Sequence, residues 1–197
     1  MIMKKLLLYI ILIFSFQSFS NANDISDFEI EGMSVGDSLL KFFSEKEIRE
    51  GAHAKEFKDN TYTQTTFYPS TLETYEGITV SYKTTDKKYI IVGLGGALTC
   101  KNNIEKCYKK QNEIINDLKQ MFPNLEVNGP VKKDLSWSNT GSTTNQTHME
   151  FIDGDIVGVQ SYEFSKEDRK NKNINHFLRV NIFIEEYNYW LVNIAYE

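Results

Sequence analysis

Apolar side chains recur at the helical period between residues 102 and 122. Asn102 or Asn103 can cap the start of this segment, and Pro123 ends it. A repeat of 3.6 residues places the apolar positions on one face, so the segment is predicted to form one long amphipathic helix. The members of that face are Ile104, Cys107, Tyr108, Gln111, Ile114, Ile115, Leu118, Met121 and Phe122.

Alternation of apolar and polar residues predicts two β-hairpins. Residues 78–82 and 89–94 flank a short polar turn, which is typical of paired antiparallel strands. The run YIIVGL at 89–94 is apolar on both faces and therefore indicates a central strand. Residues 143–164 form the second hairpin around the tight turn Asp153-Gly154-Asp155.

Two further strands are predicted outside these hairpins. Residues 61–68 are rich in Thr and Tyr and are closed by Pro69, which favours an edge strand. Residues 176–184 carry enough apolar positions for a buried strand. The polar stretches 123–142 and 168–175 show neither period and are predicted to be loops.

Shorter helices are predicted near both ends of the chain. Residues 33–50 contain two capping patterns, which begin at Ser34 and Ser44, and Gly51 ends the second. Residues 185–196 carry large side chains at helical spacing and predict a closing helix over a strand. These side chains are Tyr187, Trp190, Leu191 and Ile194.

Taken in order, these elements indicate an α+β fold. Hairpins dominate, so we expect an antiparallel sheet of about five or six strands with the helices packed on one face. The chain shows no internal repeat, low-complexity tract or linker. Residues 23–197 are therefore predicted to form a single domain.

The first 22 residues have the pattern of a secretory signal peptide. Lys4 and Lys5 precede an apolar run from Leu6 to Phe16, and Ser20-Asn21-Ala22 offers small residues for cleavage. A membrane anchor is the alternative, but the run is shorter than the roughly 17–25 residues that cross a bilayer. We expect cleavage after Ala22 and no membrane span in the mature protein, because no later segment is apolar enough.

Charge and composition narrow the functional classes. The whole chain has a formal net charge of −5, and loss of Lys4 and Lys5 makes it −7. An acidic surface repels phosphate backbones, so nucleic-acid binding is disfavoured. The richness in Lys, Asn, Ile, Phe and Tyr suggests a bacterial source with an AT-rich genome. The expected location is therefore the periplasm or the exterior.

Cys100 and Cys107 are the only cysteines in the chain, at the junction between a predicted strand and the long helix. Export to an oxidising compartment favours a disulfide between them. Their spacing matches neither the C-x₂₋₄-C pairs of zinc sites nor the C-x-x-C of redox pairs. Closing a loop of this size is expected to stabilise the fold by about 2.5 kcal/mol.

The segment VGDSLL at residues 35–40 is similar to the nucleophile block of the GDSL lipases and esterases. That resemblance implies Ser38 as a nucleophile, which would need an oxyanion-stabilising asparagine and a histidine base. The chain has no G-x-N-D block, and no aspartate stands three residues before a histidine. A helix N-terminus is the simpler interpretation, and no catalytic residue is assigned.

Other candidate chemistry is weaker still. Gly93, Gly95 and Gly96 lack the third glycine of a dinucleotide fingerprint, because residue 98 is Leu98. No cofactor is therefore expected. No two histidines have metal-binding spacing, and no metal site is predicted. The residues weighed for one were His53, His148, His176, Glu150, Asp153 and Asp155.

Aromatic residues raise the question of a ligand surface, because their rings stack on sugars and other ring compounds. Trp190 fits the apolar face of the closing helix and is predicted to lie in the core. Trp137 lies in a polar loop. Trp137 and His148 are the candidates for surface or ligand contact.

Taken whole, three segments resemble a group of small exported bacterial proteins of unknown function. They are GMSVGDSLLKFFSEKEI, SYKTTDKKYIIVGLGGALTCKNNIEKCYKKQNEI and HFLRVNIFIEEYNYWLVNIAY. The resemblance implies a shared secreted α+β fold and supplies no activity. Two hypotheses follow: a non-enzymatic module that binds a ligand or an envelope protein, or a small periplasmic hydrolase with an unrecognised site near Ser38 or His148.

Overall fold

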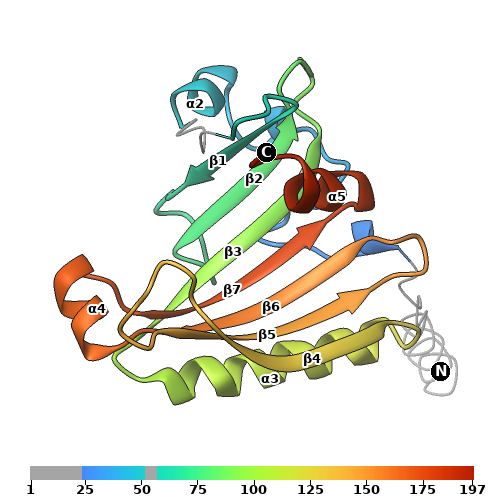
Figure 1. Cartoon of the computed structure of the whole chain (residues 1–197). Coiled ribbons are helices and arrows are strands. Elements are labelled where there is room, and N and C mark those ends of the chain that lie inside the picture. Colours follow the sequence, from blue (N-terminus) through green and yellow to red (C-terminus); the bar gives the residue numbers. More distant parts are fainter. Residues whose placement is uncertain (1–23, 52–56) are drawn as a thin grey trace, which may run out of the picture.

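A computed structural model describes residues 24–51 and 57–197 of the chain (Figure 1). Within those residues, one seven-stranded antiparallel sheet is accompanied by four α-helices, which confirms the α+β class. The expected signal peptide at residues 1–22 and the candidate His53 lie outside the described residues.

The strand order places the last strand at the centre of the sheet. The order is β1-β2-β3-β7-β6-β5-β4, and every neighbouring pair is antiparallel. The strands are β1 (Tyr62–Phe67), β2 (Gly77–Lys83), β3 (Ile91–Lys101), β4 (Glu126–Asp134), β5 (Thr143–Glu150), β6 (Ile156–Glu163) and β7 (His176–Phe183).

The sheet has seven strands where the sequence predicts five or six. The additional strand is β4, which lies in the stretch 123–142 that is predicted to be a loop. Almost all of its residues are exposed, because it is an edge strand that pairs only with β5. A register shift between Asn128 and Val131, around Gly129 and Pro130, also breaks any alternation. The sequence of β4 therefore has neither the apolar run of a buried strand nor the alternation of a half-buried one.

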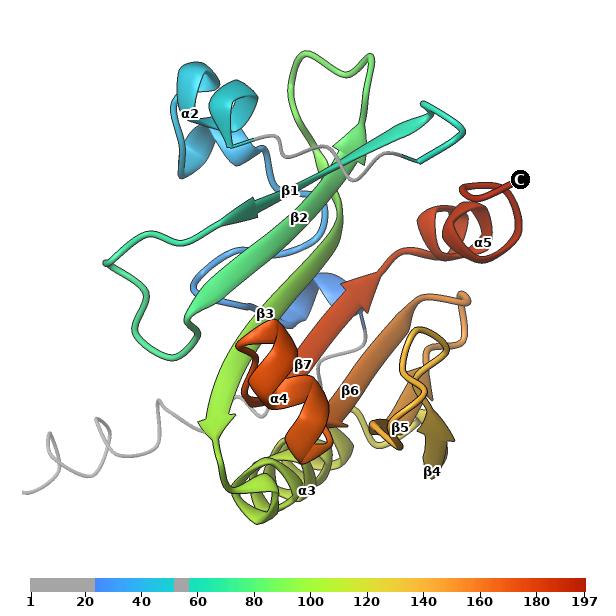
Figure 2. The ribbon, with the colours of Figure 1, turned by 60° about the vertical axis from the view of Figure 1, so that its left-hand side comes forward.

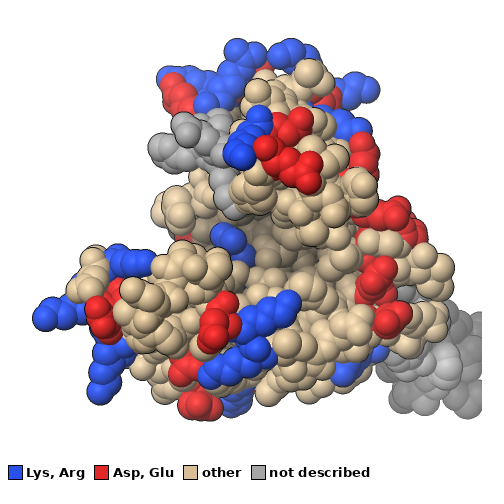
Figure 3. Space-filling model, viewed as in Figure 1, with Lys and Arg blue, Asp and Glu red and all other residues tan. Residues whose placement is uncertain are grey.

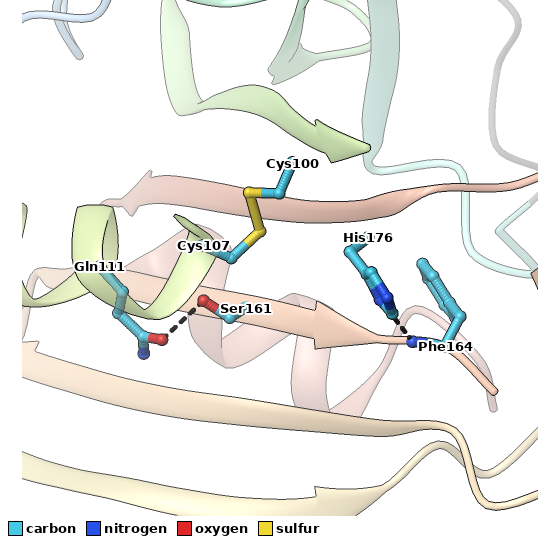
Figure 4. The surroundings of a disulfide bond; sticks show 6 residues. All are labelled: Cys100, Cys107, Gln111, Ser161, Phe164 and His176. Carbon is cyan, nitrogen blue, oxygen red and sulfur yellow. Dashed lines mark hydrogen bonds between the residues drawn. A yellow bond between two sulfur atoms is a disulfide. The ribbon is translucent and has the colours of Figure 1, made fainter. Parts of the chain in front are cut away.

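Helix α3 (Ile104–Met121) packs on one face of the sheet and closes the main core. Cys107, Ile115 and Leu118 turn toward the buried strand residues Val159 and Val180. Figure 4 shows Cys107 joined to Cys100 at the end of β3, with an S–S distance of 2.05 Å. The predicted disulfide is confirmed, and it ties α3 to β3.

Gln111 is the polar member of the buried face of α3. Its Nε2 donates to the backbone oxygens of Asn145 and Val159, 3.0 and 3.1 Å away. Ser161 Oγ donates to its Oε1 at 2.7 Å (Figure 4). Each polar atom of this buried amide is thus paired, which is what a core position requires.

Helix α5 (Glu185–Asn193) packs on the opposite face, so the expectation that all helices share one face is wrong. Tyr187 lies against Gly93, where a Cβ would come within 2.7 Å of its ring. A second cluster of apolar residues forms there, and Trp190 is buried in it as predicted. In Figure 2 the sheet runs between α3, at the bottom, and α5, on the right.

The N-terminal segment departs from prediction. Of the described residues 33–43, only Leu39–Lys41 are helical, as a short 3₁₀-helix before α2 (Glu45–Glu50). Gly36 N donates to Ile91 O and Leu39 N donates to Tyr89 O, so the backbone pairs with the residues entering β3 instead of coiling. α2 begins with the predicted capping box at Ser44.

A fourth helix, α4 (Lys166–Lys172), replaces most of the predicted loop 168–175. Its composition is charged throughout and gives no apolar stripe. What starts it is Ser165, whose side chain accepts a hydrogen bond from Asp168 N. α4 lies at one end of the sheet and does not cover the middle of the strands (Figure 1).

Candidate functional site

The sheet face opposite α3 is hollowed beside α5, over residues of β1, β2, β3, β6 and β7 (Figure 3). We call this hollow the open-face groove, and its volume is about 210 Å³. Uncharged atoms form most of its visible surface in Figure 3. The lining residues are Gln64, Thr79, Ser81, Gly93, Leu94, Gly95, Gln160, Tyr162, Arg179, Asn181, Phe183, Leu191 and Tyr196.

The groove floor is polar because of strand alternation. Leu178, Val180 and Ile182 of β7 point into the α3 core, which sends Arg179 and Asn181 to the other face. The register pairs Arg179 with Gln160 and Asn181 with Gly158 on β6, so the same alternation continues across the sheet. A row of polar side chains thus crosses several strands.

Gly95 makes room for this row. A Cβ at this position would lie 2.5 Å from Asn181 Oδ1, closer than any real contact allows. A larger residue would therefore displace the Asn181 amide from the groove floor. Close approach is the reason that glycine is needed here.

Arg179 and Asn181 are the two lining residues whose polar groups are uncommitted. Asn181 is 9% exposed and Arg179 is half-buried. Neither side chain hydrogen-bonds or forms an ion pair with any residue that the structure describes. No aspartate or glutamate among the described residues lines the groove. The guanidinium is thus a positive charge inside a hollow without an internal counter-ion.

The remaining polar groups are held in fixed orientations. Tyr162 Oη donates to Gln160 Oε1 at 2.7 Å, and Gln160 Nε2 lies 3.4 Å from His148 Nε2. Partial desolvation, and then the charge of Lys133, lower the pKa of His148 from its ordinary value. Burial raises the pKa of Tyr162, with Arg179 acting in the opposite direction.

The α5 side of the groove is fixed by a second network. Ser81 Oγ donates to Tyr187 Oη at 2.8 Å, and Gln64 Nε2 lies 3.3 Å from the same oxygen. Burial raises the pKa of Tyr187. Ser81 thus has a phenol as its partner and no base, so the contact orients α5 and does not activate a nucleophile.

Trp137 lies at the other end of the groove, on an apolar surface that we call the aromatic shelf. The shelf consists of Trp137, Tyr162, Phe164, Lys172, Ile174 and Phe177 and bounds a volume of about 300 Å³. Trp137 is 50% exposed, and Lys172 Nζ lies 3.8 Å from the centre of its ring. Tyr162 belongs to both the shelf and the groove.

The two sequence candidates for ligand contact are thus placed near the groove. Trp137 lies on the shelf, and His148 lies exposed on β5, beside Gln160. Sequence reasoning missed Arg179 and Asn181, which carry the uncommitted polar groups. The signal was present in the two polar residues at alternate positions of β7, Arg179 and Asn181, but only the position of α5 shows that this face stays open.

Ser38 does not have the surroundings of a nucleophile. Its hydroxyl donates to Lys88 O at 2.6 Å and accepts from Leu40 N at the start of the 3₁₀-helix. Of the described histidines, His148 contacts Gln160 and His176 Nδ1 accepts from Phe164 N. The capping interpretation of this serine is the one that the geometry supports.

In residues 24–51 and 57–197, no cluster of three or more His, Cys, Asp or Glu could hold a metal ion. No helix in the same residues has the length and apolar character needed to cross a membrane.

No protein-family model, curated protein or solved structure matches this chain.

Proposed function

We propose that the protein is an exported, non-enzymatic binding module whose open-face groove holds a small anionic ligand. The observation that carries the proposal is Arg179, a half-buried guanidinium without a carboxylate partner among the described residues. A buried charge is costly unless it is paired, so a groove of this kind favours an anion that supplies the missing partner.

The chemistry of the neighbouring residues favours binding over catalysis. A guanidinium offers a planar fork of donors that matches a carboxylate or a phosphate. Around it stand amides and hydroxyls, which orient a ligand without reacting with it. Histidines and carboxylates are missing from the described lining residues, so the groove itself offers no evident general base.

Replacing Arg179 with glutamine should weaken binding of small carboxylates at least about tenfold, because one charge-assisted hydrogen bond is worth more than about 1.4 kcal/mol. Isothermal titration of the purified protein with acetate, succinate and inorganic phosphate measures this. Lys109→Gln is the matched control, because Lys109 is exposed on α3. This substitution changes the net charge by the same amount as Arg179→Gln. Equal affinity of both variants would contradict the proposal.

Export is tested separately, by the mass of the protein recovered from the periplasm of an expressing bacterium. We expect a chain that begins at Asn23, because Ser20-Asn21-Ala22 provides the cleavage site. A variant with Ala22→Arg should accumulate as the uncleaved precursor. An intact precursor of the unaltered chain in the cytosol would remove export from the proposal and leave the groove untouched.

A further inference from the structure

The open-face groove and the aromatic shelf are physically continuous. Tyr162 lines both, and Phe177 stands two residues from Arg179 on the same face of β7. The rings of Tyr162 and Phe177 stack with their centroids 4.3 Å apart. Phe164 follows at 5.6 Å from Phe177, and Trp137 at 5.9 Å from Phe164. The polar hollow that holds Arg179 thus opens directly onto the rings of Tyr162, Phe177 and Trp137, with Lys172 over the Trp137 ring.

The shelf is held in place by a buried carboxylate. Asp168 Oδ2 accepts hydrogen bonds from the hydroxyls of Ser138, Thr140 and Ser142, at 2.5, 2.7 and 2.5 Å. These hydroxyls lower the pKa of Asp168 to about 2, so it stays ionised at any physiological pH. The loop that carries Trp137 is thereby fastened to α4. A surface ordered before binding costs less entropy when a ligand settles on it.

Resting on the proposed function, we propose that groove and shelf form one site for an acidic saccharide. The carboxylate of one sugar unit pairs with Arg179, and its hydroxyls meet the amides of Gln160 and Asn181. The neighbouring sugar unit lays its apolar C–H face on the rings around Trp137.

Two other anion classes fit the lining less well. An inorganic anion accepts hydrogen bonds and donates few, so the amide oxygen of Asn181 next to Arg179 would face it unpaired. An aromatic carboxylate would cover the shelf but leave the amides and hydroxyls of the groove without partners, which is costly once water is displaced. A sugar hydroxyl both donates and accepts, so it can satisfy a mixed lining of this kind.

The test is titration with galacturonate and digalacturonate, and with glucuronate and a disaccharide that contains it. The unaltered protein is expected to bind each disaccharide about tenfold more tightly than its monosaccharide. Trp137→Ala should remove that advantage and leave monosaccharide affinity unchanged, whereas Arg179→Gln should weaken both. Tyr189→Ala is the matched control, because Tyr189 is an aromatic residue of α5 that is 64% exposed and outside both surfaces.

A second measurement tests the contact with Trp137 in a protein that keeps this residue. The chain has two tryptophans, so in Trp190→Phe the fluorescence reports Trp137 alone. Disaccharide should shift that emission, and monosaccharide should not.

The outcomes separate the two proposals. Binding of acetate or phosphate as tight as that of the hexuronates keeps the anion groove and overturns the saccharide. Tighter binding of phenylacetate does the same, and so does a Trp137→Ala variant that keeps the disaccharide advantage. If no anion binds the unaltered protein at all, the proposed function fails and the saccharide with it.

Discussion

Replacing Trp190 with alanine is expected to lower the free energy of unfolding by about 3–5 kcal/mol. The indole is 4% exposed, and its ring lies 4.9 Å from the rings of both Phe57 and Tyr62. Its Nε1 also donates to Asp59 Oδ1 at 2.6 Å. Truncation would therefore leave a cavity and remove a hydrogen bond to a charged group.

Urea unfolding followed by circular dichroism measures this loss, and a melting temperature lower by roughly 10 °C should accompany it. Trp190→Phe should lower the free energy of unfolding by less, because a phenyl ring still fills part of the apolar cluster around α5. Tyr189 precedes Trp190 and is exposed, so Tyr189→Ala should change the free energy of unfolding by no more than about 0.5 kcal/mol. A Trp190→Ala variant as stable as that control would mean that α5 is not anchored as described.

The second large effect is loss of the disulfide. The double variant Cys100→Ala with Cys107→Ala is expected to be less stable by about 2.5 kcal/mol, because the unfolded chain regains the freedom of the closed loop. Both sulfurs are buried, at 6% and 0% exposure, so lost packing adds to the entropic effect.

Denaturant unfolding of three samples separates these contributions: unaltered protein, unaltered protein with excess reductant, and the double variant. The oxidised protein should be the most stable, the reduced protein should lose the entropic contribution, and the double variant should be less stable still because it also loses packing. Thiol titration of the oxidised protein should find no free cysteine, since its two cysteines form the bridge. Equal midpoints for oxidised and reduced protein would show that the bridge contributes nothing to stability.

The parts of the fold that the sequence predicted well are those with strong periodicity. Helix α3 repeats apolar residues over five turns, and its polar core residue Gln111 still keeps the helical spacing. In the hairpins β2–β3 and β5–β6, Ile78 and Val80 of β2 and Val157 and Val159 of β6 alternate and are buried in the main core. In these segments local pattern and tertiary burial agree.

The missed elements lack that agreement. β4 is exposed on both faces, so nothing in its side chains distinguishes it from a loop. α4 has seven residues, KEDRKNK, and depends on the cap at Ser165 and the contacts of Asp168. Residues 34–43 have helical spacing, but pairing of this backbone with Tyr89 and Ile91 overrides it. Propensity is a weak signal wherever tertiary contacts decide.

The candidate site also has features that the sequence predicts and features that only the fold supplies. Alternation in β7 already sends Arg179 and Asn181 to the same side of the strand. What the sequence cannot supply is the register that brings Gln160 opposite Arg179, or the fact that α5 covers only one end of that face. Trp137 was recognised as a surface residue, but its neighbours on the shelf come from β6, β7 and α4.

The central position of β7 constrains how the chain can fold. Residues 176–183 follow the other six strands in sequence, yet they join β3 to β6 and so connect two three-stranded halves. Until β7 is synthesised, each half has an unpaired inner edge, and the two halves of the sheet cannot be joined. Truncation before residue 176 therefore removes the middle of the sheet instead of a dispensable tail.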